Sequence, residues 1–127
     1  MTEKKMQLGE FCWYQLMTNN PQKGQEFYGP LLNWNFQEHE FDGTKYTSIN
    51  TGEKDIGGII PVPQAEKDRI SSHWLNYINV EDLDKTLAKA KDLGATVCVE
   101  PTVIKNLGRF AVIIDPVGAS VAFWQMG

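Results

Sequence analysis

Apolar residues along this chain form eight short runs, which are interrupted by two segments with helical periodicity. The runs are too short for helices and are rich in aromatic and β-branched residues, which is typical of strands. The expected strands cover residues 11–17, 33–40, 44–51, 55–60, 74–80, 95–100, 108–114 and 119–125. One expected helix follows the first strand and the other follows the fifth. The pattern therefore predicts two consecutive units with the order β-α-β-β-β.

Both expected helices begin at a polar capping residue, and these two residues lie 62 positions apart. Asn20 precedes Pro21 in the first copy, and Asp82 occupies the same place in the second. Asn and Asp side chains accept hydrogen bonds from the free N–H groups of a first helical turn, where proline is also tolerated. The matching caps indicate that the second unit repeats the first.

Apolar residues at helical spacing are expected to face a core. In the first helix they are Phe27, Tyr28, Leu31 and Leu32. The pair Gly29-Pro30 should end or kink that helix, because the proline ring disfavours helical geometry at the residue before it.

Glycine and proline mark turns and irregular positions between the strands. Asp42-Gly43 is a strong signal for a two-residue hairpin turn. Gly57-Gly58 lies inside an expected strand, where it indicates a close backbone approach or a bulge. Pro101 is expected to close the sixth strand, with a loop after it.

The predicted fold class is α+β, with one domain built from two modules. Residues 1–8 form an N-terminal tail, and residues 9–127 form the domain. Module one covers residues 9–60, a linker covers 61–72, and module two covers 73–127. A helix covers only one face of each half-sheet, so we expect the mixed sheets to curl around a cleft between the modules.

Composition excludes several classes of partner. At 127 residues the chain is long enough to bury a core without metal or disulfide. The net charge of −4 argues against nucleic acid. No apolar run approaches the roughly 20 residues of a membrane-spanning helix, and the N-terminus has no apolar signal segment. We expect a cytoplasmic protein in which Cys12 and Cys98 are buried, reduced thiols.

The order of these modules and three local sequences resemble the vicinal oxygen chelate superfamily, which includes glyoxalase I, bleomycin-resistance proteins and extradiol dioxygenases. The local sequences are Phe27-Tyr28, residues 80–84 and the turn at 115–118. The resemblance covers residues 9–127 and is strongest to the single-domain, glyoxalase-like branch. It implies a homodimer as well as the paired-module fold.

In metal-using members of that superfamily, each module supplies one ligand from its first strand and one from its last. The equivalent positions here are Trp13, Leu75 and Ala122, and residues 56–60 contain no ligating side chain. Indole, isobutyl and methyl groups do not bind the divalent metals that use His, Gln or Glu ligands. We therefore expect neither a metal nor another cofactor.

Alternation along the strands predicts a ligand site in the cleft. Its expected members are mostly aromatic or apolar, with a few hydrogen-bonding groups. They are Trp13, Gln15, His73, Leu75, Tyr77, Ala122 and Trp124. Such a lining is typical of a pocket for a flat or hydrophobic organic molecule. His39, between two glutamates, is expected to be an ordinary surface residue.

The sequence leaves the question of enzymatic activity open. The first hypothesis is a metal-independent module that binds an apolar or aromatic small molecule. The second is a glyoxalase-like lyase or isomerase, or a dioxygenase, with an atypical metal site. The third is a metal-independent enzyme that uses Tyr77, His73 or Gln15 for proton transfer.

Overall fold

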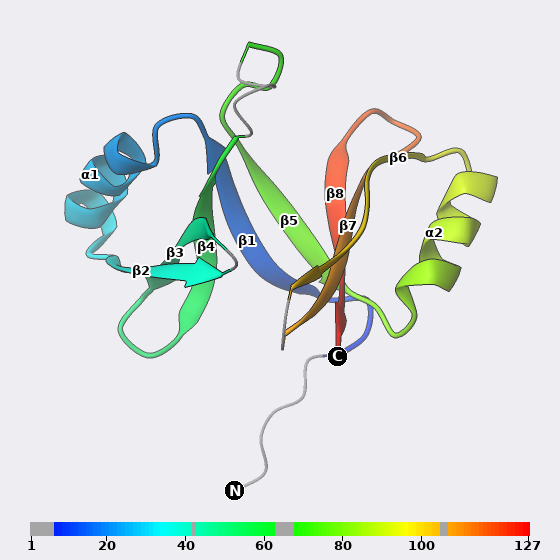
Figure 1. The fold of residues 1–127 in the computed structure, drawn as a ribbon, viewed down its shortest axis with the longest axis horizontal. Coiled ribbons are helices and arrows are strands. Elements are labelled where there is room, and N and C mark those ends of the chain that lie inside the picture. Colours follow the sequence, from blue (N-terminus) through cyan, green and yellow to red (C-terminus); the bar gives the residue numbers. More distant parts are fainter. Residues whose placement is uncertain (1–6, 42, 63–67, 105–106) are drawn as a thin grey trace, which may run out of the picture. The chain divides into compact units, whose positions relative to one another are not determined.

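The computed structural model describes residues 7–41, 43–62, 68–104 and 107–127. This part of the chain contains eight strands and two helices in the predicted order. Their bounds are β1 (Phe11–Thr18), α1 (Pro21–Leu32), β2 (Asn35–Phe41), β3 (Thr44–Asn50), β4 (Asp55–Pro61), β5 (His73–Asn79), α2 (Leu83–Asp92), β6 (Thr96–Ile104), β7 (Gly108–Ile114) and β8 (Ser120–Met126). The α+β class with mixed strand pairing is confirmed (Figure 1). Asp42, in the predicted hairpin turn, lies outside the described residues.

The chain divides into two compact units. The first unit comprises residues 13–75, and the second comprises residues 1–12 and 76–127. Hydrogen bonding orders the strands as β2-β3-β4-β1 in the first unit and as β5-β8-β7-β6 in the second. β1 runs parallel to β4, and β5 runs parallel to β8. No helix in the described ranges is long and apolar enough to cross a membrane.

The core of the first unit lies between α1 and the sheet. Leu16, Ile49 and Ile59 are buried there, at 7%, 1% and 1% exposure, and Tyr28 of α1 packs against them. The Asn20 side chain accepts a hydrogen bond from the Lys23 N–H over 3.1 Å, so the predicted cap is confirmed.

Of the four apolar residues of α1 that were expected to face the core, only Tyr28 packs against it. Phe27 is 58% exposed and Leu31 is 59% exposed, and no residue of this helix is fully buried. The expected end at Gly29-Pro30 is also wrong, because the helix continues to Leu32 and is capped by Asn33 in a left-handed conformation. Pro30 removes only one N–H from the last turn, where the unpaired carbonyl can be hydrated.

The core of the second unit lies between α2 and β7. Leu83 and Leu87 of α2 pack on Ala111 and Ile113, and all four are at most 5% exposed. Asp82 accepts a hydrogen bond from the Lys85 N–H over 3.1 Å, which confirms the second cap.

The expected end of the sixth strand at Pro101 is wrong, because β6 continues to Ile104. β6 lies last in the strand order of its unit, so a residue there needs no hydrogen bond on its outer side. The pairing with β7 also shifts register between Val99 and Thr102, on either side of the proline. An edge position and a local irregularity together accommodate a residue without an N–H.

Candidate functional site

The second unit has a sheet face that its own helix does not cover, here called the helix-free face of that unit. Ala111 and Ile113 of β7 point toward α2. Phe110 therefore points the other way, since successive side chains alternate across a strand. Phe110 pairs directly with Trp124 of β8, and Val112 pairs with Ala122. These paired side chains share the helix-free face.

Tyr77 joins this face from β5. It pairs with Ala122, and its ring centroid lies 6.0 Å from that of Phe110. Tyr77 is 5% exposed and Ala122 is fully buried, whereas Trp124 is half-buried. The structure thus brings three predicted site residues together on one aromatic and apolar surface. Phe110 was not predicted, although its alternation with Ala111 was a usable signal.

The first unit has a helix-free face of its own. Leu16 packs toward α1, so Trp13 and Gln15, which alternate with it along β1, point to the opposite side. Trp13 is half-buried and Gln15 is 6% exposed. The Gln15 amide donates to the sulfur of Met17 over 3.6 Å.

The two remaining predicted residues lie at the start of β5. Leu75 is 4% exposed. His73 is half-buried, and its Nδ1 lies 2.8 Å from the carbonyl oxygen of Ser71. Because a carbonyl oxygen only accepts, Nδ1 carries the proton of this hydrogen bond. Ligand binding by these seven residues stays a prediction.

A polar cluster on the helix-free face of the first unit was missed by the sequence interpretation. His39 Nε2 lies 3.0 Å from the Ser48 hydroxyl, and the His39 and Tyr46 ring centroids are 5.6 Å apart. Ser48 is only 3% exposed. His39 is half-buried, and the sequence interpretation did not foresee its contacts with Ser48 and Tyr46. The sequence did contain a signal for this position of His39. Phe36 packs against the core, and a strand residue three positions later points to the opposite face.

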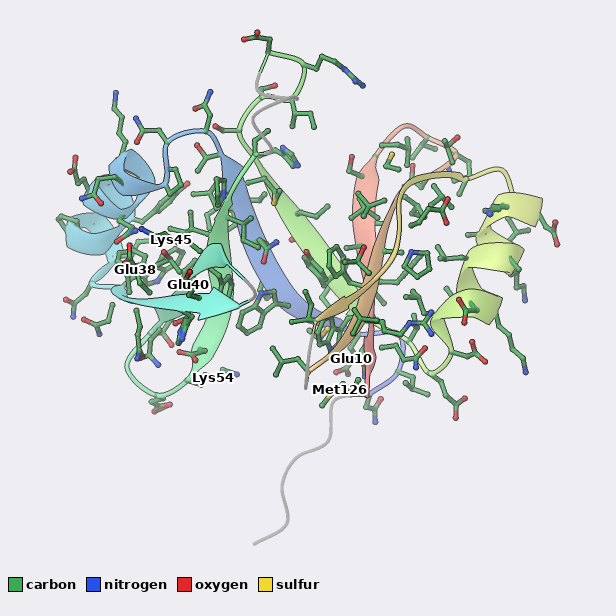
Figure 2. All side chains as sticks on the ribbon, viewed as in Figure 1. Glu10, Glu38, Glu40, Lys45, Lys54 and Met126 are labelled. Carbon is green, nitrogen blue, oxygen red and sulfur yellow. The ribbon has the colours of Figure 1, made fainter. Side chains whose placement is uncertain are left out.

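The charged neighbours of this cluster point away from it. Glu38 and Lys45 line a recess of about 230 Å³ together with residues of α1, on the covered side of the sheet (Figure 2). His39 and Tyr46 alternate with them along β2 and β3 and therefore face the other side. Charged and neutral polar residues are thus separated onto opposite faces.

The two cysteines differ in their surroundings. Cys12 is half-buried, and desolvation raises the pKa of its thiol, because burial disfavours the thiolate. Cys98 is exposed, so the expectation of a buried thiol is wrong there. Its strand, β6, has only one neighbour in the strand order, which leaves side chains on that edge less covered.

The residues at the expected metal positions do not fit a metal. Trp13, Leu75 and Ala122 offer no ligating atom, and β4 contributes only Gly57 and Gly58 near the equivalent position of the first unit. Within the described ranges, no three His, Cys, Asp or Glu side chains are grouped so that they could hold a metal ion. The donor chemistry therefore supports no step that passes through a metal.

A sequence profile of the Glyoxalase/Bleomycin resistance protein/Dioxygenase superfamily matches residues 11–123. The chain belongs to this superfamily. A similar curated protein is the "Putative glyoxylase CFP32" of Mycobacterium tuberculosis, which is 34% identical over 87% of this chain and 42% of its own length. The "Anthracycline biosynthesis protein DnrV" of Streptomyces peucetius is 24% identical over 94% of this chain and 48% of its own length.

Solved structures of this superfamily share the fold. Methylmalonyl-CoA epimerase from Mycobacterium tuberculosis superimposes with a TM-score of 0.64 at 15% identity, over 94% of this chain and 88% of the epimerase chain. At that identity the similarity establishes the fold alone. The present chain spans less than half the length of the two curated relatives, 42% and 48%.

Proposed function

We propose that this chain binds an apolar or aromatic small organic molecule on the helix-free face of its second unit, without a metal. The observation that carries this proposal is the aromatic surface of the second unit, where Tyr77, Phe110 and Trp124 share one face. Aromatic side chains with a few hydrogen-bonding groups are the usual lining of sites for organic ligands.

The donor set supports the metal-independent part of the proposal. Bleomycin-resistance proteins, glyoxalases and dioxygenases share one superfamily description, so membership alone decides neither metal use nor catalysis. The residues at the expected ligand positions are an indole, an isobutyl group and a methyl group. Binding through stacking and apolar contact does not require metal-ligating side chains, which these positions do not provide.

Titration calorimetry with 2-naphthamide, a flat neutral probe, tests the proposal. We expect the wild-type chain to bind it, and we expect Trp124→Ala to weaken binding by about fivefold or more, because an aromatic contact contributes roughly 1 kcal/mol beyond area burial. Trp74→Phe is the matched control. Trp74 donates from Nε1 to the Tyr28 hydroxyl over 3.2 Å on the α1 side, so its replacement should leave the affinity unchanged.

The same titration is repeated after exhaustive treatment with a chelator. An unchanged affinity is expected if binding is metal-independent. Loss of binding after chelation, with recovery on adding back a divalent metal, would favour the atypical metal site instead. No heat from 2-naphthamide with the untreated protein would contradict the proposal as a whole.

We also propose that the protein is a homodimer. The supporting observation is the uncovered apolar side of α1, where Phe27 and Leu31 are 58% and 59% exposed. Contiguous apolar surface of this kind is typical of protein interfaces. Light scattering should give twice the chain mass of 14.4 kDa. Leu31→Glu should shift the mass toward that of a monomer, whereas Leu93→Glu, at a 68% exposed site on the other unit, should not.

A further inference from the structure

We infer that the recess on the covered side of the first unit binds a small zwitterion, namely an α-amino acid with a short apolar side chain. The recess lies between the beginning of α1 and the strands β2, β3 and β4. The inference goes beyond the proposed function, which concerns the helix-free face of the second unit. It involves neither a metal nor a catalytic step.

Two side chains of opposite charge line this recess. Glu38 on β2 pairs directly with Thr47 on β3, and Lys45 precedes Thr47 by two positions, so that all three share one face. Diagonal neighbours of this kind lie roughly 7–8 Å apart. Both charged side chains are exposed and border the recess (Figure 2). A small molecule that carries both charges can therefore lie between them.

Neither of these charges is neutralised by the protein. In the described ranges, no ion pair joins Lys45 to Glu38, or to Glu40, which lies directly opposite Lys45 on β2. The Lys45 ammonium can donate to a ligand carboxylate, and the Glu38 carboxylate can accept from a ligand ammonium. Hydrogen bonds between charged groups are about twice as strong as those between neutral ones. An α-amino acid carries both of the partners that this pair requires.

A polar group inside the recess also has room for a ligand. Thr47 is only 6% exposed, and its hydroxyl makes no hydrogen bond with any residue that the structure describes. Within the same residues, no fully buried side-chain oxygen lacks a partner, so this hydroxyl is reached through the recess that Thr47 lines. A nearly buried hydroxyl without a partner is costly, and a bound polar molecule would remove that cost. Thr47 thus points to a polar ligand independently of the two charges.

The size and the walls of the recess limit the class of ligand. Its volume of about 230 Å³ lies below the roughly 300–1,000 Å³ that is usual for drug-sized molecules. Pro21, Ile59 and Pro61 supply apolar surface beside the polar groups. Burial of a short aliphatic side chain against this surface is favourable. L-Valine combines such a side chain with the two charges.

Titration calorimetry compares L-valine with two analogues that each lack one charge. Isovalerate lacks the ammonium group, and L-valinamide lacks the carboxylate. We expect L-valine to bind and each analogue to bind about tenfold more weakly, since hydrogen bonds to charged groups are the stronger class. The absence of saturable heat with L-valine would overturn the inference, as would an analogue that binds as tightly as L-valine.

Two charge-removing variants assign the contacts. Lys45→Gln should weaken L-valine binding by about tenfold and leave L-valinamide unaffected, because that analogue has no carboxylate for Lys45 to bind. Glu38→Gln should weaken L-valine binding to a similar extent and leave isovalerate unaffected. If either variant weakened all three probes equally, the assigned pairing of charges would be wrong.

Matched variants separate the recess from general charge effects. Glu53→Gln and Lys54→Gln remove the same charges from exposed positions outside the recess and should leave the affinity for L-valine unchanged. Thr47→Val keeps the side-chain shape and should weaken L-valine about fivefold through loss of one hydrogen bond. Equal weakening by the Lys45 and Lys54 variants would refute the inference. Lys45→Gln should retain its affinity for 2-naphthamide, so this inference and the proposed function can fail independently.

Discussion

Gly57→Ala is expected to destabilise the fold by roughly 3 kcal/mol or more, at the upper end of the range for overpacked sites. A Cβ at Gly57 would fall on the carbonyl oxygen of Tyr14 and within 2.9 Å of its carbonyl carbon. Gly57 and Tyr14 are paired in the parallel β1–β4 ladder. Backbone atoms there cannot move aside without breaking the hydrogen bonds that join the two strands.

Urea unfolding followed by circular dichroism measures the decrease in the free energy of unfolding. Gly24→Ala is the matched control, because its Cβ would meet only the flexible end of Leu16, at 3.2 Å, and alanine is the better helix former by about 1 kcal/mol. We expect the control to change stability by less than about 1 kcal/mol in either direction. A comparably small change for Gly57→Ala would contradict the close approach of the two strands.

The fold was predictable because local signals agree with one another. Asn20 and Asp82 both cap helices as expected, and the eight apolar runs all became strands. The Gly57-Gly58 signal also proved to mark a close approach, of backbone at the first glycine and of a tyrosine ring at the second. These features depend on a few neighbouring residues, so a single sequence contains them.

The errors share a different cause. Pro101 is compatible with a strand only because β6 lies at an edge and shifts register there, which depends on a partner strand distant in sequence. Phe27 and Leu31 have the spacing of a core helix, yet both side chains are more than half exposed. Periodicity shows which residues share a face, but the neighbouring elements decide whether that face is covered.

The candidate site was predictable to a similar extent. Alternation correctly placed Tyr77, Ala122 and Trp124 on one face of the second unit. His39 was dismissed because its sequence neighbours are glutamates, although strand neighbours point to opposite faces. Its real partner, Ser48, lies across a hairpin and becomes visible only once the register is known.

Leu83→Ala is expected to destabilise the second unit by about 2–5 kcal/mol, which is the usual range for a fully buried leucine. Leu83 has no exposed surface and packs with Ala111 and Ile113 beneath the first turn of α2. Its backbone N–H donates to Gln125 Oε1 of β8 over 2.7 Å, so the helix start and the sheet are joined at this residue. Truncation would open a cavity where the surrounding atoms are held by that hydrogen bond and can relax only partly.

Chemical denaturation measures the decrease in the free energy of unfolding. Leu93→Ala, at a 68% exposed site, is the control, and its free energy of unfolding is expected to change by no more than about 0.5 kcal/mol.

Binding provides a second readout. Leu83 lies on the α2 side of the sheet, whereas Trp124 alternates with Gln125 and faces the other side. We therefore expect the folded variant to bind 2-naphthamide with unchanged affinity. If Leu83→Ala weakened binding as much as Trp124→Ala, the proposed separation between a structural, helix-covered face and a ligand-binding, helix-free face would be wrong.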